Sequence, residues 1–329
     1  MRLLSLFVIL GILAVSCLAK DPGTTSGTGG AVGSGGVMGT GGKTGMGGAT
    51  SAGGKIGTGG ATSAGGTTST GGSSVPTSVD CTDTSTYSSL VIGQYGATQI
   101  PVDNNSNKNY EMQANWWGKP YNSQQEQLTG LGFTMTNPGN AITSVKDTPM
   151  GYPSIYIGSY QTRPTKGSNL PKQISTLTSV PTIFSTNADS MGNSNYVADY
   201  DIWLTQSSSV LGSSASDPGA GGAFLMVWLF KPSDRQPKGS AIADGRIIDG
   251  VPGAWTVWAD TANPPCVSYV SIAKLSELQF DLNLFIQDAV KQKYGNISSS
   301  QYLSIIFAGF EVWGGGDGLQ VKQFCANVK

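Results

Sequence analysis

Residues 307–319 read FAGFEVWGGGDGL, an apolar run that ends in a cluster of glycines and carries Glu311 near its centre. Strands are rich in β-branched and aromatic residues and are often bounded by glycine, whereas glutamate is depleted inside them. An ionised carboxylate is also costly to bury without a partner. The stretch therefore predicts a β-strand in which Glu311 has a function, and it raises the question of which polar group lies beside it.

Strand alternation predicts the neighbours of Glu311, because successive side chains point to opposite faces of a sheet. In the strand expected at 302–313, Glu311 shares a face with Gly309 and Trp313. The segments DYDIWL (199–204) and AFLMVWLF (223–230) alternate in the same way, with core residues on their other face. The remaining residues predicted on the polar and aromatic faces are Asp199, Asp201, Trp203, Phe224, Met226, Trp228 and Phe230.

From Cys81 onward the chain has short strand-like runs separated by Gly, Pro, Asn and Ser, which is typical of an all-β sandwich or barrel. We expect one domain at 81–329. One segment has a helical period instead: SELQFDLNLFIQDAVKQKYG (276–295) predicts the single substantial helix, lying against the outside of a sheet. The strand candidates are 110–116, 132–136, 200–204, 223–230, 255–258, 266–272, 302–313 and 319–326.

The first 20 residues, MRLLSLFVILGILAVSCLAK, place Arg2 before a short apolar run, which is the pattern of a secretory signal. The run is shorter than the about 20 apolar residues of a membrane-spanning helix. Cys17 follows A-V-S, which resembles the site of a lipidated bacterial cysteine, so lipidation of Cys17 and its removal with the signal both stay open. We expect an exported protein, either an outer-membrane or cell-surface lipoprotein or a secreted protein.

Residues 21–80 consist mostly of Gly, Thr, Ser and Ala, and they contain GGATSAGG twice, at 47–54 and 59–66. A segment with almost nothing apolar to bury does not offset the entropy of folding. The sequence therefore predicts a disordered linker before the folded domain.

Composition excludes several classes of protein. The chain has 329 residues, a formal net charge of −1 and no His. The charge favours neither nucleic acid nor an anionic membrane, so membrane contact would come only through a lipid anchor. Without His or a CxxC pair, catalytic triads, HExxH sites and thiol metal sites are excluded, and proton transfer would depend on carboxylates. No metal or organic cofactor is implied, and a monomer is expected.

Three cysteines lie in the expected domain, namely Cys81, Cys266 and Cys325. Export favours a disulfide, because extracellular compartments are oxidising. We expect one bridge and one free cysteine, and the sequence leaves all three pairings open.

Tryptophans that share strands with carboxylates suit a cleft for a sugar polymer. An indole ring stacks on the apolar face of a pyranose, while polar groups bind its hydroxyls. Trp116 and Trp117 in NYEMQANWWG, with Trp255 and Trp258, add further flat apolar surface. Any single Trp could be an ordinary core residue, but the set as a whole predicts a carbohydrate cleft.

A series of short motifs occurs along the domain: NWWG (115–118), YPSIYIG (152–158), LPKQISTLTSVPT (170–182), YDIWL (200–204), LMVWL (225–229), QPKGS (236–240), AWTV (254–257) and, after the helix, AGFEVWGGGDGLQVKQF (308–324). This series resembles glycoside hydrolase family 12, which contains endo-β-1,4-glucanases and xyloglucanases. The resemblance covers essentially all of 81–329, and the motifs fall in the family's order.

The resemblance implies a β-jelly roll of two curved antiparallel sheets with one helix and an open cleft for a β-1,4-glucan such as cellulose, mixed-linkage glucan or xyloglucan. It also implies retaining hydrolysis by two glutamates, whose carboxyl groups would lie about 5–5.5 Å apart. By motif, Glu311 matches the acid/base, Asp201 matches the aspartate beside the nucleophile, and Trp117 matches a sugar-stacking residue. Met226 and Trp228 match cleft residues on the nucleophile strand.

The resemblance places the nucleophilic glutamate two residues before Met226, where this chain has Phe224. A phenyl ring offers no lone pair for attack on an anomeric carbon. Three readings follow: non-hydrolytic glucan binding with Phe224 as a stacking surface, hydrolysis with Asp201 or Asp199 as the second carboxylate, and a structural or adhesive surface protein that no longer binds glucan.

Overall fold

The computed structural model describes Val79, Cys81, Tyr87 and residues 88–102, 107–118, 125–136, 148–161, 163–190, 195–209, 211–212 and 215–329. The expected signal segment, Cys17 and the expected linker up to residue 78 lie outside these residues and remain predictions. Within the described ranges, no helix is long and apolar enough to cross a membrane.

The described strands form two sheets, and the larger has the order β12-β13-β14-β11-β10-β16-β6-β3-β2, with β7 paired to β6 and β8 to β16. Its neighbouring strands are antiparallel except for β11 and β14, which are parallel. The strands are β2 (Ala97–Pro101), β3 (Asn109–Gln113), β6 (Ser154–Tyr160), β7 (Arg163–Pro164), β8 (Lys172–Gln173), β10 (Asn195–Thr205), β11 (Ala223–Phe230), β12 (Ser240–Arg246), β13 (Trp255–Ala259), β14 (Cys266–Ser271) and β16 (Tyr302–Gly314).

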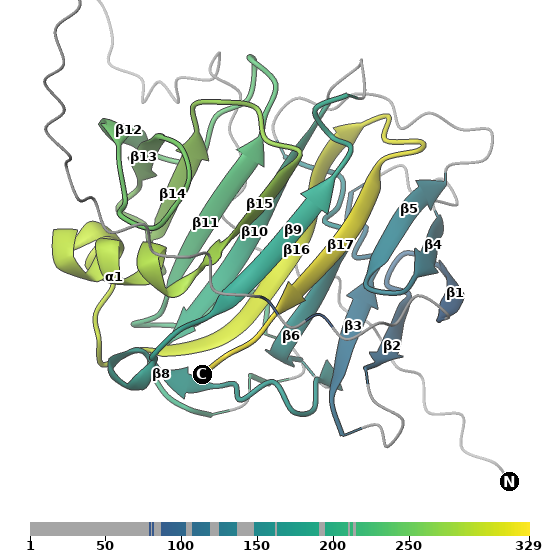
Figure 1. Ribbon diagram of the computed structural model, residues 1–329, viewed down its shortest axis with the longest axis horizontal. Coiled ribbons are helices and arrows are strands. Elements are labelled where there is room, and N and C mark those ends of the chain that lie inside the picture. The colour runs from purple at the N-terminus through teal and green to yellow at the C-terminus, as the bar shows by residue number, and fades with distance from the viewer. Residues whose placement is uncertain are drawn as a thin grey trace, which may run out of the picture. The chain divides into compact units, whose positions relative to one another are not determined.

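The smaller sheet is antiparallel throughout and has the order β1-β4-β5-β17-β9-β15. Figure 1 shows it layered on the larger sheet, with helix α1 at the side where β12, β13 and β14 lie. The predicted all-β sandwich is therefore confirmed, and the parallel pair is an exception to the antiparallel expectation. The remaining elements are β1 (Ser88–Ile92), β4 (Gln125–Thr129), β5 (Gly132–Thr136), β9 (Pro181–Thr186), β15 (Glu277–Asp281), β17 (Gln320–Ala326), α1 (Asn283–Gln292) and the short helices η1 (Ile174–Thr176) and η2 (Tyr294–Asn296).

The main core lies between the two sheets, and the alternation of β10 and β16 builds its larger-sheet side. Tyr200 and Ile202 of β10 and Phe310 of β16 point into this core, as predicted. The ring of Tyr200 lies 5.4 Å from that of Phe184 on β9 and 6.0 Å from that of Phe324 on β17, centroid to centroid. Aromatic pairs of this kind contribute about 0.5–1.5 kcal/mol beyond their burial, so they hold the sheets in one register.

The predicted helix at 276–295 is wrong in its first half, which forms strand β15, whereas part of the second half forms α1. Leu278 and Phe280 alternate with partly exposed residues and are buried in the main core, so a period of two residues prevails here. Asp281 marks the change of structure, because its Oδ1 accepts the backbone N–H of Asn283 at 3.0 Å. The same apolar residues fit both periods, which explains the error.

Helix α1 packs against the main core and not on an outer face of a sheet. The ring of Phe285 lies 4.9 Å from that of Trp255 on β13 and 4.9 Å from that of Tyr269 on β14. Asp288 of the helix accepts hydrogen bonds from the Arg246 guanidinium and from the Tyr269 hydroxyl, the latter at 2.9 Å. These contacts tie β12, β13 and β14 to the core, and they make Trp255 a core residue.

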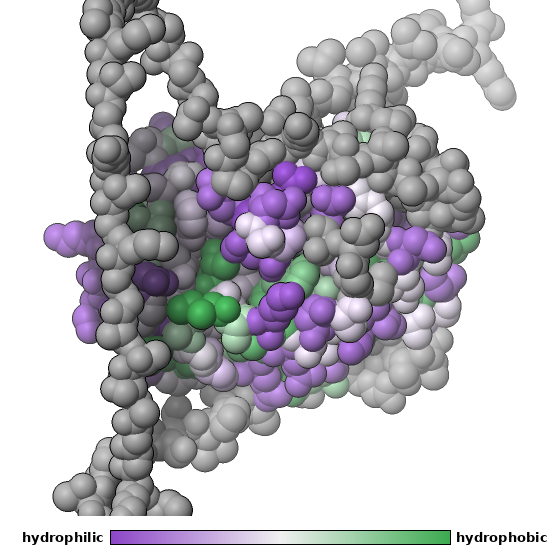
Figure 2. Space-filling model, turned by 90° about the horizontal axis from the view of Figure 1, so that it is seen from above, coloured by the Kyte–Doolittle hydropathy of each residue, from purple (hydrophilic) through white to green (hydrophobic). Residues whose placement is uncertain are grey.

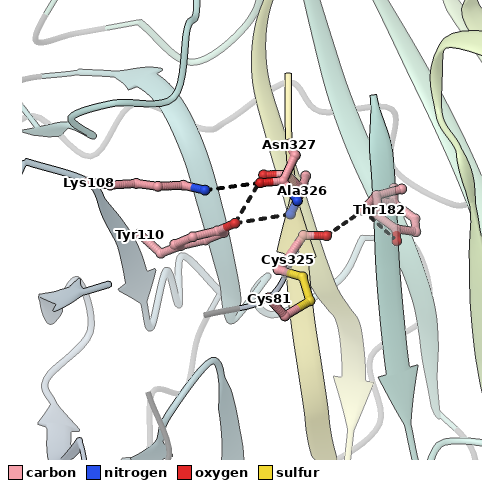
Figure 3. The surroundings of a disulfide bond; sticks show 8 residues. Cys81, Lys108, Tyr110, Thr182, Cys325, Ala326 and Asn327 are labelled. Carbon is pink, nitrogen blue, oxygen red and sulfur yellow. Dashed lines mark hydrogen bonds between the residues drawn. A yellow bond between two sulfur atoms is a disulfide. The ribbon is translucent and has the colours of Figure 1, made fainter. Parts of the chain in front are cut away.

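A disulfide joins Cys81 to Cys325 of β17, with Cα atoms 5.9 Å apart. Figure 3 shows the bond beside Tyr110 of the larger sheet, whose hydroxyl donates to the Ala326 carbonyl and accepts the Ala326 N–H, each at 3.0 Å. The bridge is one of the three pairings that the sequence left open. The expectation of one free cysteine is wrong, because the part of the chain that the structure describes holds none.

Removal of the bridge in the variant Cys81→Ala/Cys325→Ala should lower the free energy of unfolding by about 2–4 kcal/mol, because the bond restricts the unfolded chain. Urea denaturation followed by circular dichroism measures this change. Lys322→Ala, an exposed change on β17, is the control and should stay within about 0.5 kcal/mol of wild type. A double variant as stable as this control would contradict the expectation.

Candidate functional site

A second buried cluster lies on the face of the larger sheet that points away from the smaller sheet, and we call this face the site face. Among the described residues, the main core contains side chains of both sheets, whereas this cluster contains those of the larger sheet and its connections. The predicted alternation is thereby confirmed for β10 and β16, and for β11 as far as Trp228. The cluster comprises Tyr152, Tyr156, Tyr160, Val197, Trp203, Phe224, Met226, Trp228, Cys266, Val270, Ile305, Phe307 and Trp313, with Trp117, Leu211 and Trp258 partly buried beside it.

Two adjacent strands, β10 and β16, bring three buried carboxylic side chains to the site face. Asp199 of β10 is paired with Gly309 of β16, and Glu311 stands two residues further along β16. Asp199 and Glu311 are therefore diagonal neighbours, a relation in which Cβ atoms lie within about 7–8 Å. Asp201 lies two residues from Asp199 in the direction away from Glu311. The carboxylate next to Glu311 is therefore that of Asp199 and not that of Asp201.

Burial and mutual repulsion raise the proton affinity of these aspartates. Burial raises the pKa of Asp199 well above its ordinary value, and the negative charges of Glu311 and Asp201 raise it further. Burial also raises the pKa of Asp201 to about 7, although the indole N–H of Trp203, 2.9 Å from Asp201 Oδ2, opposes this rise. The hydroxyl of Tyr152 donates to the main-chain carbonyl of Asp199 at 3.1 Å. Burial and the neighbouring negative charges therefore favour the neutral form of Asp199, which is able to donate a hydrogen bond.

Phe224 stands on β11 opposite Trp203, and the two ring centroids lie 5.7 Å apart with the planes at 86°. Its ring is buried and meets the indole edge to face. Glu311 stands opposite Val197, which precedes Trp203 by six residues on β10, or about 20 Å of strand. In this register Phe224 does not face Glu311 directly.

The rest of β11 brings no carboxylate to the site face either. Met226 is paired with Asp201, and Trp228 is paired with Asp199. Both aspartates therefore face apolar side chains across this strand pair, which is consistent with the raised pKa values.

A small pocket on the site face brings aromatic and polar residues together. It is lined by Gln113, Asn115, Trp117, Tyr152, Tyr160, Asp201, Trp203 and Phe307. Two residues that the sequence placed far apart, Trp117 and Asp201, thus line the same pocket. Two amides and a carboxyl group beside flat rings form a surface that binds hydroxyls together with the apolar face of a ring.

Several buried polar atoms of the site face have no hydrogen-bond partner among the described residues. Buried polar groups in native proteins are nearly always paired, so such a group indicates a ligand or a bound water. The atoms are Gln113 Oε1, Trp117 Nε1, both carboxylate oxygens of Asp199, Asp201 Oδ1, Trp228 Nε1 and Trp313 Nε1. A ligand rich in hydroxyl groups would pair with them, because a hydroxyl both donates and accepts.

Besides Trp255, two residues expected on the site face lie in the main core instead. Trp116 is buried between the sheets, where its N–H donates to Glu126 Oε1 of β4 at 2.8 Å. Phe230 also joins the main core, because a β-bulge between Ala198 and Asp199 interrupts the pairing of β11 with β10. The predicted sugar-stacking position of Trp116 is therefore wrong.

The sequence reasoning missed the tyrosines that β6 and its flank bring to the site face. Tyr152, Tyr156 and Tyr160 are spaced by four residues, so they have one parity, and this spacing is the signal that identifies them. Glu111 of β3 lies beside Tyr156 and forms an ion pair with Arg163 at 2.9 Å. Burial raises the pKa of Glu111 to about 7, although the charge of Arg163 opposes the rise.

Comparisons with known proteins agree with this geometry. Residues 108–329 match the model of glycosyl hydrolase family 12. The probable cellulase Cel12b of Mycobacterium tuberculosis is 29% identical over 164 residues, which cover 49% of this chain and 99% of that protein. The endoglucanase Cel12A of Rhodothermus marinus is 26% identical with a TM-score of 0.61, over 73% of this chain and 99% of that one. A metagenome-derived family 12 endoglucanase is 26% identical with a TM-score of 0.63, over 74% of this chain and 98% of that one.

The buried Glu126 should make the fold less stable as the pH rises. Burial raises its pKa from 4.5 to about 7, although the Trp116 N–H opposes the rise. The unfolded chain loses this proton at lower pH than the folded protein, so stability falls between about pH 4.5 and 7. Glu126→Gln keeps an acceptor for Trp116 and removes the titration.

Urea denaturation of wild type and Glu126→Gln, at about pH 5 and about pH 7.5, measures this difference. The variant should lose less free energy of unfolding between the two pH values than wild type loses. An equal loss in both proteins would contradict the assignment of the raised pKa to Glu126.

Proposed function

The chain belongs to glycosyl hydrolase family 12, and on this basis we propose that it is an exported protein that binds β-1,4-glucan on the site face without cleaving it by the family's two-glutamate route. Cellulose, mixed-linkage glucan and xyloglucan are the candidate ligands. Glu311 stands at the acid/base position of the motif, and Phe224 stands at the position of the nucleophile.

The composition of β11 carries this proposal. The residues that β11 directs to the site face are Phe224, Met226 and Trp228, and all three are apolar. Double displacement needs an oxygen nucleophile on the sugar side opposite the leaving group, and none of these side chains offers one. Glu311 alone could protonate a leaving oxygen, but β11 would not supply the attacking group that completes the reaction.

Glucan binding is supported by the unpartnered polar atoms and the exposed part of the aromatic surface. Trp117 is partly exposed and lines the pocket with Asp201 and Asn115. The indole donors of Trp228 and Trp313 lack partners among the described residues, and hydroxyl groups of a glucan would supply them. The raised pKa values of Asp199 and Asp201 suit this role, because a neutral acid exchanges hydrogen bonds with hydroxyls without the cost of burying a charge.

The diagonal position of Asp199 beside Glu311 favours a second candidate function, hydrolysis through these two groups. In this reaction an ionised Asp199 oxygen bonds to the anomeric carbon as the glycosidic C–O bond breaks and Glu311 gives its proton to the leaving oxygen. Water then attacks the anomeric carbon, gives a proton to Glu311 and releases Asp199. The raised pKa of Asp199 opposes this route, because it lowers the fraction of the group that is ionised and able to attack.

Wild-type protein should sediment with insoluble cellulose or be retarded in a β-glucan gel, and it should release no more reducing ends than Glu311→Gln. Trp117→Ala should weaken binding by about tenfold, because the loss of one aromatic contact in a binding site costs about 1–2 kcal/mol. A depletion isotherm and a reducing-sugar assay measure the two properties.

The alternatives give different results in these assays. Reducing ends above the Glu311→Gln level would exclude the binding-only proposal, and their loss in Asp199→Asn would support the second candidate. Absence of retardation by cellulose, mixed-linkage glucan and xyloglucan would leave a structural or adhesive role.

Phe224→Glu restores a carboxylate at the motif position of the nucleophile and should raise the release of reducing ends above the wild-type level. Phe224→Gln, which has nearly the same size as the glutamate and no charge, is the matched control and should stay at the wild-type level. If both variants fold and neither releases more reducing ends than wild type, the offset between residue 224 and Glu311 along β10 keeps the two carboxylates too far apart.

A further inference from the structure

A groove of about 700 Å³ lies at the ends of β11 and β14, next to the start of β10. Phe230 and Leu229 form an apolar part of its wall, and Asn195 and Ser271 add an amide and a hydroxyl. The groove shares none of its lining with the small pocket that contains Trp117 and Asp201. It is therefore a separate candidate for binding.

The groove lies near the Glu311 end of the site face. Asn195 on its wall is paired with Gly314, three residues after Glu311 on β16. Arg235 connects the two regions, because its guanidinium carbon lies 4.7 Å from the ring centroid of Trp313 on the site face. The main-chain oxygen of Arg235 accepts a hydrogen bond from Lys231 Nζ in the groove at 2.7 Å.

The groove has more positive than negative charge. Lys231 and Lys274 line it together with Asp234, which leaves two positive charges and one negative charge. The Lys231 ammonium is held by the main-chain oxygens of Pro232 and Arg235, at 3.2 and 2.7 Å. The Lys274 ammonium is exposed and lies 5.7 Å from the centroid of the Phe230 ring. A fixed cation and an exposed cation beside an aromatic ring suit an anionic sugar unit.

We infer that this groove binds carboxylate-bearing glucosyl units of a β-1,4-glucan whose neutral units lie on the site face, an inference that rests on the proposed function. The apolar wall would contact ring faces, and the two ammonium groups would pair with the carboxylate. Figure 2 shows the molecule from above, where hydrophobic residues occur between hydrophilic ones. An apolar surface and a positive charge are both needed to hold a charged sugar.

The test compares binding to two insoluble polymers, cellulose and cellulose whose C6 hydroxyls have been oxidised to carboxylates. Wild type should bind the oxidised polymer about two- to fivefold more tightly at low salt, as expected for exposed ion pairs. The preference should vanish at about 1 M salt, where the Debye length is about 3 Å. Lys274→Gln should reduce it at low salt, and Lys274→Glu should reverse it.

Lys322→Gln is the matched control, because Lys322 is an exposed lysine on β17 of the smaller sheet. This variant should keep the wild-type preference. Equal binding of both polymers by wild type would overturn the inference, and so would an equal loss of the preference in Lys274→Gln and Lys322→Gln. In either case, binding to plain cellulose would still support the proposed function. Failure to bind either polymer would overturn both.

Discussion

Strand β10 is the element on which the rest of the domain depends, because it hydrogen-bonds to β11 on one side and to β16 on the other. Its alternation directs Tyr200 and Ile202 into the main core and Asp199 and Asp201 to the site face. A slip of one residue would exchange the two sets and bury carboxylates between the sheets. The packing of Tyr200 against Phe184 therefore also determines where the carboxylates lie.

The site face combines buried acids with apolar partners, and this combination decides the chemistry available there. Asp201 is opposite Met226, and Asp199 is opposite Trp228, so neither acid has a cation across the β10–β11 pair. Such surroundings favour the neutral acid, which is a hydrogen-bond donor and a poor nucleophile. The same surroundings suit a ligand that is uncharged and rich in hydroxyl groups.

Strand alternation allowed much of the fold to be predicted, because a half-buried sheet imposes a period of two residues. The predicted bounds at 132–136 and 223–230 are those of β5 and β11. Register and long-range partners carry no such local pattern. Asp199 and Glu311 are diagonal neighbours because of the register in which β10 pairs with β16. The burial of Trp116 depends on Glu126, an acid from β4. The segment that became β15 was misjudged because its apolar residues fit two periods.

The last two strands in chain order hold central places, since β16 lies between β10 and β6, and β17 lies between β5 and β9. Until both strands have been synthesised, each sheet exists as two separate halves with unpaired inner edges. Open edges are templates for pairing with other chains, and contacts between distant parts of a chain form slowly. A nascent chain is therefore most prone to aggregate before β16 and β17 have been added to the sheets, so translation speed and chaperones should influence its yield strongly.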